Sequence, residues 1–426
     1  MPIRVDFHFV YTEGVWIRPI NGFGVSAFDV FFLLAMGSWM LRAVLDHRLR
    51  IRLFPGISIP FLLVWIIAIP GVLRTTMPDI VMASVIWTVF KNWLVFIYIA
   101  NNIHVVGSIR QVVVLLLVVG MLQSLIGLAQ YVTGGKLGLA MFGEAERSFF
   151  EMRAGAGTVS RVAGTLGHPN KLAVFLNLLL QMNFALFFAG LSRRVKLALC
   201  IPFALMGLTM LLTYSRGGWL GLALGGTVVL YWCLAKNSRN RLFSVVLMTV
   251  FLGIFLIVVI GSVQSVKRRL FEDDYGTAAL RIPMSVVALN IIRHFPLTGV
   301  GLNNYTAVIE RHDTTAMAVS YDFPRPVHNE FLLIAAEQGL IGLGLFLVIL
   351  AQMFIVLFRT ARSPGAPFRS WVTIGFFGGW LGWCLHHQFE YEYVFFSEIT
   401  WVLFGLFQAM TLLQDSQPQE NDCVRP

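Results

Sequence analysis

Apolar segments of about 20 residues, long enough to span the hydrocarbon core of a bilayer as helices, recur along the whole chain. No other feature of the sequence restricts the fold as strongly. The predicted spans are 26–44, 57–73, 80–100, 111–131, 171–190, 195–213, 217–235, 243–263, 329–358, 370–386 and 395–414. The first 25 residues could add a re-entrant element. The sequence therefore predicts an all-α polytopic membrane protein with 11–12 transmembrane helices.

The composition leaves no room for a large soluble domain. Hydrophobic residues make up 57% of the chain and charged residues 13%, whereas a soluble domain carries about 25% charged residues. We therefore predict a single integral membrane domain, 1–426. The net charge of +10 would suggest nucleic acid in a soluble protein. Because Lys and Arg also mark the cytoplasmic loops of membrane proteins, we predict no nucleic-acid partner.

Lys and Arg gather in four short loops that fall on one side of the membrane when the predicted spans alternate. These residues are Arg48, Arg50, Arg52, Arg193, Arg194, Lys196, Lys236, Arg239, Arg241, Arg359, Arg362 and Arg369. We take this side as cytoplasmic. The outer side then holds the loop 132–170, the turn around Arg216 and the long loop 264–327. The two outer loops contain eleven Lys and Arg residues, which suggests an anionic ligand on that face.

Residues 281–294 of the long outer loop follow the pattern of an amphipathic helix. Pro283 fits the first turn of such a helix, and Pro296 stops it. The apolar stripe consists of Ile282, Val286, Leu289 and Ile292. We expect this stripe to lie on the bilayer surface or to pack on the helical bundle.

The turn "TYSRGG" places Arg216 between two spans on the outer side, against the positive-inside rule. Such an arginine could simply extend its charge to the membrane surface. Alternatively, its planar guanidinium could bind a phosphate or diphosphate through two hydrogen bonds. Gly217 and Gly218 would then let the ligand approach the backbone closely.

The segment "RVAGTLGHPNK" precedes the fifth span. We expect Asn170 to cap that helix and His168 to shape the turn before Pro169, whereas Arg161 is a candidate ligand contact. Arg281 begins the outer amphipathic helix, where a cation opposes the helix dipole. An anionic ligand near Arg281 would offset this cost.

His328, Asn329 and Glu330 lie where the long outer loop enters the ninth span. A histidine side chain can accept a proton near neutral pH, which makes His328 a candidate base. Asn329 or Glu330 could instead cap the helix. Glu337 lies deeper in the apolar segment, where a carboxylate is a functional candidate, although it could instead pair with an arginine or hold the helix in place.

A further polar segment, "HHQFEYEY", follows the tenth span on the same outer face. Its polar residues, His386, His387, Glu390 and Glu392, could contact an acceptor. Lys91 lies within the third span, where an unpaired charge is costly. We expect Lys91 to pair with a carboxylate or to extend toward the surface. The four cysteines show no metal-binding spacing, and no metal is predicted.

The motifs "RVAGTLGHPN", "LLTYSRGGWLGL", "ALNIIRHFPLTGVGLNNY" and "VHNEFLLIAAEQGLIGLGLF" occur in this order. Together, over residues 160–350, they resemble the O-antigen ligase/polymerase superfamily of bacterial envelope enzymes. The resemblance implies an inverting glycosyltransferase of the bacterial inner membrane that needs no metal or cofactor and whose active site faces the periplasm. Its donor would be a glycan on undecaprenyl diphosphate. The acceptor of the ligase branch would be a sugar of the lipid A core.

Carried onto this sequence, the family's functional positions match Arg161, Arg216, Arg281 and His328. Fixed arginines would stabilise the charge on the leaving diphosphate, and His328 would take the proton of the acceptor hydroxyl. We therefore predict Arg216, Arg281 and His328 as catalytic residues. The predicted substrate-binding residues are Arg161, Arg147, Glu330, Asn329 and His168.

Three alternatives stay open at this point. The ligases are expected to have twelve spans, so the polymerase branch, whose acceptor is a growing glycan, also fits. A transporter or flippase of an anionic lipid-linked glycan would place its basic residues along a path through the membrane, whereas here they crowd the outer loops. A structural partner in an envelope assembly would tolerate changes at His328 and Arg216.

Overall fold

The structure is a computed structural model, and it describes residues 6–11, 20–46, 50–73, 78–106, 109–145, 151–154, 157–237, 280–362 and 367–412. Its long helices are α1 (Ala27–Leu45), α2 (Pro55–Leu73), α3 (Asp79–Val106), α4 (Ile109–Thr133), α5 (Pro169–Leu186), α6 (Arg193–Leu212), α7 (Arg216–Asn237), α10 (Arg281–His294), α13 (Glu330–Arg362), α14 (Pro367–His386) and α15 (Glu398–Ala409). The short helices are α11 (Tyr305–His312), α12 (Val319–Asp322), η1 (Ala140–Phe142) and η2 (Val394–Phe396). Each predicted span except 243–263, which lies outside the described residues, coincides with one long helix.

Seven of the described helices are long and apolar enough to cross a membrane, namely α1, α2, α3, α4, α6, α7 and α13. Helix α5 is more polar because it carries Asn177, Gln181 and Asn183, all of them buried inside the bundle. Helix α15 has 12 residues and is shorter than the predicted span 395–414. The chain is an all-α polytopic membrane protein, as the sequence predicted.

Two short antiparallel hairpins accompany the helices. Strands β1 (Asp6–Tyr11) and β2 (Gly22–Ser26) pair near the N-terminus, and β3 (Glu151–Ala154) pairs with β4 (Gly157–Ser160). The described part of the first 25 residues therefore contains a hairpin. The sequence left open a re-entrant element in this segment, and the described residues do not form one.

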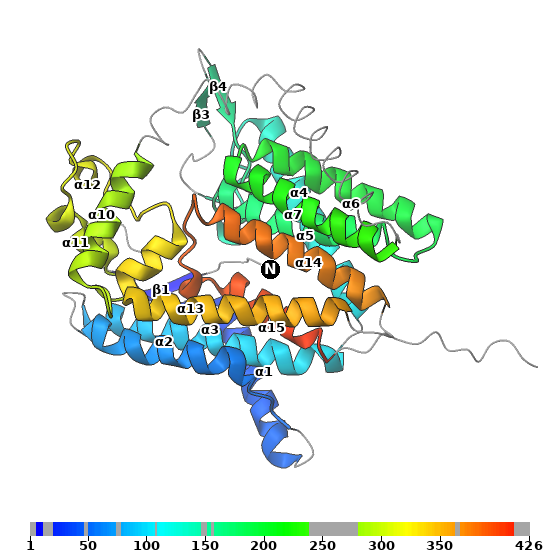
Figure 1. Cartoon of the computed structure of the whole chain (residues 1–426), viewed down its shortest axis with the longest axis horizontal. Helices are drawn as coiled ribbons and strands as arrows, with labels where there is room; N and C mark the ends of the chain where they lie inside the picture. The colour runs from blue at the N-terminus through cyan, green and yellow to red at the C-terminus, as the bar shows by residue number, and fades with distance from the viewer. Residues whose placement is uncertain are drawn as a thin grey trace, which may run out of the picture.

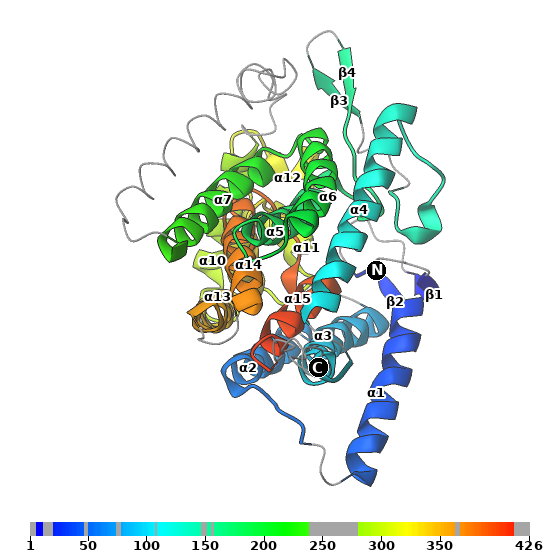
Figure 2. The same ribbon diagram turned by 90° about the vertical axis from the view of Figure 1, so that its right-hand side faces the viewer.

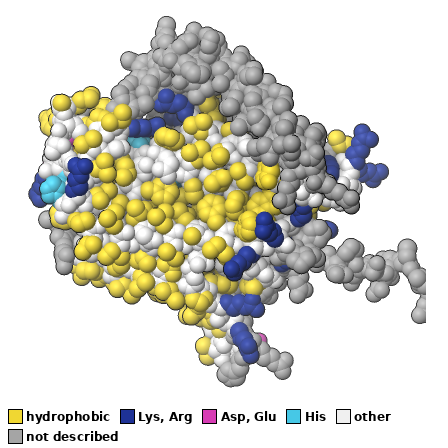
Figure 3. All heavy atoms as spheres, in the orientation of Figure 1, with side chains coloured by type: hydrophobic (Ala, Val, Ile, Leu, Met, Phe, Trp, Pro, Cys, Tyr) yellow, Lys and Arg dark blue, Asp and Glu magenta, His cyan; other side chains and the backbone are white. Residues whose placement is uncertain are grey.

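The long helices form a bundle with α10, α11 and α12 gathered at one end (Figure 1). Helix α14 packs against α5, α7 and α13, while α13 also packs against α2, and α15 against α3. Helix α1 lies at the edge of the bundle (Figure 2). Apolar side chains cover much of the face formed by α2 and α13, and Lys and Arg side chains gather toward the helix ends (Figure 3). This distribution suits a protein surrounded by lipid.

Glycine allows α7 and α14 to approach each other closely. A Cβ atom on Gly225 would lie 2.3 Å from the carbonyl oxygen of Gly378, and one on Gly221 would lie 2.6 Å from that of Gly382. Small residues are the usual means by which membrane helices pack backbone against backbone. The outer ends of α7 and α14 are therefore held at a short and well-defined separation.

Helix α13 is broken at Gly339, whose φ of 67° and ψ of −177° are not helical. The sequence predicted the span over 329–358, which α13 confirms, but it did not predict the break at Gly339. Backbone of the segment 296–301 fills the break. The amides of Val300 and Gly301 donate to carbonyls at the end of the first part of α13, at 3.0 and 2.8 Å. The carbonyl of Pro296 accepts from the amide of Leu340, at 2.8 Å, at the start of the second part.

This insertion explains why a break within an apolar helix is stable. Each end of a helix leaves backbone groups without intrahelical partners, and such groups are costly in a membrane unless protein satisfies them. Glu337 adds a side-chain contact, since it accepts a hydrogen bond from the amide of Tyr305 at 3.2 Å. Both parts of α13 are thereby tied to the outer loop.

The sequence allowed Lys91 either to pair with a carboxylate or to extend toward the surface, and in the structure it is paired. Its Nζ atom lies 2.6 Å from a carboxylate oxygen of Asp29 and 2.6 Å from one of Glu398. The two ion pairs join α3 to the first turns of α1 and α15. Because a buried charge is costly without a partner, this cluster constrains how the three helices pack.

Candidate active site

Four segments that are distant in sequence meet at the end of the bundle where α5, α7 and α13 begin and α14 ends. Arg161 and His168 precede α5, and His328 precedes α13. Glu390 lies in the connection between α14 and α15. The close packing of α14 on α5 and α7 brings these helix ends together.

A continuous set of hydrogen bonds, here called the polar network, joins Arg161, Asn170, Glu390 and His328. The Nδ1 atom of His328 lies 3.0 Å from Oε1 of Glu390. The side-chain amide of Asn170 donates to Oε2 of the same carboxylate. In turn, the Asn170 side-chain oxygen accepts from a terminal guanidinium nitrogen of Arg161 at 2.9 Å. The network therefore couples a candidate base to a carboxylate and a cation.

Glu390 is charged under physiological conditions. Its burial alone would raise the pKa of the carboxyl group, but the hydrogen bond from His328 and the attraction of the neighbouring histidines outweigh burial and hold the pKa well below the usual range. The residue is 9% exposed. The ring of Tyr391 packs edge-on against His328, with 5.3 Å between the ring centroids. These contacts restrict the orientation of the His328 imidazole.

The turn that carries Arg216 is attached to the polar network. The Nε atom of Arg161 donates to the carbonyl of Thr213 at 2.9 Å, three residues before Arg216. Arg216 is the first residue of α7, and Ser215 caps this helix by accepting from the amide of Gly218 at 3.3 Å. Arg216 therefore lies close to the network along the chain, at the N-terminal end of a helix.

On the other side of this turn, Gly217 faces His386 at the end of α14. A Cβ atom on Gly217 would lie 3.0 Å from the Nδ1 atom of His386. His386 is buried and precedes Glu390 by four residues. The Arg216 turn is thus enclosed by the segment that supplies Glu390.

His168 caps α5, because its Nδ1 atom accepts a hydrogen bond from the amide of Asn170 at 3.2 Å. The sequence assigned this cap to Asn170, which was wrong: the helix begins at Pro169, and the Asn170 side chain belongs to the polar network. Burial, together with the cations Arg161 and Lys171, lowers the pKa of His168 to about 4 although Glu390 acts in the opposite direction. His168 is therefore neutral at physiological pH.

Asn329 and Glu330 also have local partners. The Asn329 side chain accepts from the amide of Leu332 at 3.0 Å and caps α13. The Glu330 carboxylate accepts hydrogen bonds from the amides of Glu392, Tyr393 and Val394, at 2.6, 3.1 and 2.7 Å. These contacts favour a positioning role for both residues, in which they hold the Glu390 segment against α13.

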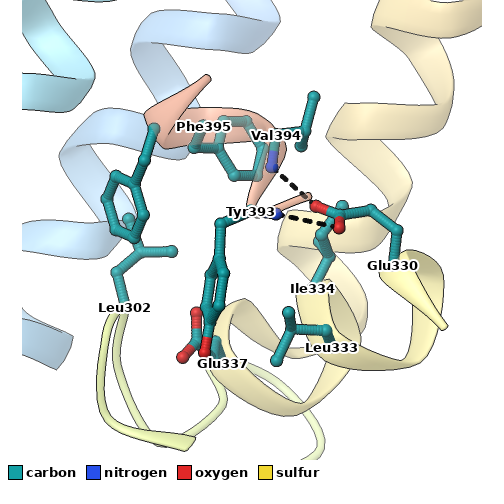
Figure 4. A pocket seen from close by; sticks show the side chains of 9 residues that line it. Leu302, Glu330, Leu333, Ile334, Glu337, Tyr393, Val394 and Phe395 are labelled. Atoms are coloured by element: carbon teal, nitrogen blue, oxygen red, sulfur yellow. Dashed lines mark hydrogen bonds between the residues drawn. The ribbon is translucent and has the colours of Figure 1, made fainter. Parts of the chain in front are cut away.

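A small pocket lies next to the contact between Glu330 and the backbone of the 393–394 segment (Figure 4). Its lining residues are Leu302, Glu330, Leu333, Ile334, Glu337, Tyr393, Val394, Phe395 and Phe396. In Figure 4 the Tyr393 ring extends toward Glu337, while Glu330 points to the backbone of the 393–394 segment. Glu330 lines this pocket, but its carboxylate already accepts hydrogen bonds from three backbone amides. We therefore regard the pocket as part of the packing that supports the site.

The two predicted site residues that remain are Arg281 and Arg147. Arg281 begins α10, which packs on α13, and its catalytic role stays a prediction. Arg147 lies outside the described residues. Among the residues that the structure describes, no three His, Cys, Asp or Glu side chains are placed so that they could hold a metal ion.

Glu390 is the main residue of the polar network that is missing from the predicted catalytic and substrate-binding residues. The sequence named it only as one of four polar residues that could contact an acceptor. The signal that could have singled it out is the run of two histidines and two glutamates directly after an apolar helix, since buried charges in membrane proteins require partners. The partner itself, 62 residues away, could not be identified from spacing.

Residues 201–347 match a family model described as O-Antigen ligase, and the matched segment contains Arg216, Arg281 and His328. A comparison with curated proteins finds no match. Taken with the ordered motifs around the site, the match over residues 201–347 supports the resemblance to the O-antigen ligase superfamily.

Proposed function

We propose that the protein transfers a glycan from undecaprenyl diphosphate to a hydroxyl group of an acceptor sugar, in the manner of an O-antigen ligase. The observation that carries this proposal is the polar network, in which His328 is held by Glu390 and connected to Arg161. We place this site at the periplasmic face of the bacterial inner membrane. The acceptor that we propose is a sugar of the lipid A core.

His328 is the general base in this proposal. A carboxylate only accepts hydrogen bonds, so the contact with Glu390 assigns the ring proton to Nδ1 and leaves Nε2 able to accept a proton. The acceptor oxygen attacks C1 of the donor sugar and transfers its proton to Nε2. The C1–O bond to the diphosphate breaks, and the lipid diphosphate leaves with the electron pair.

Positive charge must face the leaving diphosphate, because negative charge grows there in the transition state. Arg216 suits this role because it lies at a helix N-terminus, where backbone amides also favour anions. We propose Arg281 as a second contact, brought toward the diphosphate by the outer loop. Arg161 both holds the Arg216 turn and adds charge, and Arg147 keeps its predicted role as a substrate contact.

The test is transfer by the purified protein in nanodiscs, with a lipid-diphosphate-linked glycan and a lipid A-core acceptor. We expect His328→Ala to lower kcat by about 10²- to 10⁴-fold, the usual contribution of a general base, with donor binding unchanged. His294→Ala, a change of an exposed histidine on α10, is the matched control and should retain activity. Near-normal turnover of His328→Ala would show that another group is the base.

The same assay separates the proposal from its alternatives. A transporter or flippase would move the lipid-linked glycan without joining it to the acceptor. A structural partner would yield no product with any variant. The two branches of the superfamily are distinguished by the lipopolysaccharide of a deletion strain. Loss of a ligase leaves bare core, whereas loss of a polymerase leaves core that carries a single repeat unit.

A further inference from the structure

Helix α10 carries apolar side chains on two opposite faces. One face packs on the bundle and consists of Met284, Val287, Ala288 and Ile291. The other face is the stripe expected from the sequence, and it is open: Ile282 is 73% exposed, Val286 37% and Leu289 42%. Packing on the bundle therefore accounts for one apolar face of α10 and for Ile292, whereas Ile282, Val286 and Leu289 stay substantially exposed.

The outer boundary of the membrane can be located next to α10. The second part of α13, 340–362, rises by about 35 Å at 1.5 Å per residue, which matches a hydrocarbon core of about 30 Å. Its first amides, those of Leu340 and Ile341, donate to the carbonyls of Pro296 and Leu297 at 2.8 and 3.4 Å. Residues 296–297 therefore sit at the outer end of a membrane span, and α10 ends two residues before them.

The open face of α10 lies near the outer end of this span. Leu297, Leu340 and Ile341 are joined by the backbone contacts just described, and all three side chains are exposed. In Figure 1, α10 runs across the ends of the long helices α2 and α13, as a helix parallel to the membrane surface would. Exposed apolar side chains thus lie both on the outer end of the span and on α10, with Arg293 between them.

The charges around the stripe are those that favour an anionic membrane surface. Arg293 is exposed and continues the stripe one turn beyond Leu289, and Arg311 is exposed on the neighbouring helix α11. The carboxylate of Asp313 accepts hydrogen bonds from the nearby hydroxyl groups of Thr315 and Ser320. Basic residues bordering an apolar helix face are typical of helices that lie in the bilayer interface.

We propose that α10 is an interfacial helix. Its open stripe, with Leu297, lies at the boundary of headgroups and acyl chains of the outer leaflet, and Arg293 contacts anionic headgroups. The occupant of this surface is therefore lipid. The inference concerns the outer loop and membrane alone and does not depend on the proposed glycan transfer. It resolves the two expectations for this helix: one face packs on the bundle and the other rests on the bilayer.

The experiment uses the full-length protein in nanodiscs of phosphatidylethanolamine and phosphatidylglycerol, with its four native cysteines replaced by serine. A nitroxide is attached at Leu289→Cys, and its collision rates with oxygen and with a water-soluble nickel chelate are measured. Two matched sites serve as controls. Val348→Cys reports the lipid-facing side of α13, where Val348 is 46% exposed, and Glu310→Cys reports an exposed polar position on α11.

We expect the label at Leu289→Cys to resemble that at Val348→Cys, with oxygen collisions favoured over nickel collisions. A label at Glu310→Cys should show the reverse. If Leu289→Cys behaves like Glu310→Cys, the helix stands in water and the proposal is wrong. Protection from both reagents, together with spin–spin broadening, would mean that a second copy covers the stripe, which would equally overturn it. Thermal unfolding of each labelled variant establishes that the fold is intact.

Discussion

Glu390 is the residue on which the polar network depends, because its two carboxylate oxygens accept hydrogen bonds from different segments. We expect Glu390→Gln to lower kcat by about 10²-fold, since the neutral amide no longer sets the tautomer of His328 or stabilises its protonated form. Glu390→Asp keeps the charge and should recover part of the loss. Donor KM should change little in both. A wild-type kcat for Glu390→Gln would contradict a positioning role.

A second residue-scale prediction concerns His387 and Glu392, which form a buried ion pair at 3.2 Å. Burial lowers the pKa of His387, but Glu392 outweighs it and raises that pKa above 6.5. Burial raises the pKa of Glu392, yet His387 and Ser397 bring it to about 2. The contribution of His387 to stability is therefore complete below pH 6.5 and lost as the pH rises through its raised pKa. That of Glu392 is present above pH 4.5 and lost as the pH falls toward 2.

His387→Gln should accordingly be destabilising by about 3 kcal/mol near pH 6, the cost of breaking a buried pair. The difference in Tm from the wild type should be smaller at pH 9 than at pH 6, because His387 loses its charge as the pH rises through its raised pKa. Thermal unfolding in detergent at the two pH values measures this. An equal difference at both would show that the contribution of His387 does not depend on its charge.

At the scale of secondary-structure elements, the break in α13 predicts how substitutions of two glycines of this helix change stability. Gly339 has a φ of 67°, and a Cβ atom there would lie 2.1 Å from the carbonyl oxygen of Leu297. Gly339→Ala should therefore lower stability by more than about 2 kcal/mol, because strain adds to a clash with backbone. Gly344→Ala is the matched control: an added Cβ meets nothing within 4 Å, and alanine favours the helix by about 1 kcal/mol. Equal Tm values for the two variants would contradict this account.

Which elements could be predicted depends on the range of the contacts that create them. The predicted span 111–131 corresponds to α4, Ile109–Thr133, because an uninterrupted apolar run determines its own helicity. The break at Gly339 arises from backbone of 296–301, about 40 residues away, and no local pattern reveals it. Similarly, Arg216 and His328 have distinctive local motifs, whereas Glu390 acquires its role only through helix packing.

For the whole molecule, the arrangement of helices predicts which ends face which side of the membrane. The polar network and α10 lie at one end of the bundle, while α6 begins and α7 and α13 end at the other, where Arg193, Arg194, Lys236 and Arg359 lie. The positive-inside rule predicts that the latter end is cytoplasmic. Single cysteines in a background without the native four can therefore report the sidedness of the site.

We expect a membrane-impermeant maleimide to label Lys136→Cys and Glu310→Cys in intact spheroplasts, because both positions are exposed at the end that carries the site. Arg194→Cys and Arg359→Cys, exposed at the basic end, should react only after permeabilisation. Donor glycan on a lipid diphosphate could then meet His328 from the outer side. Labelling of Arg194→Cys before permeabilisation, with protection of Lys136→Cys, would invert the orientation and place the polar network toward the cytoplasm, where the proposed periplasmic transfer could not occur.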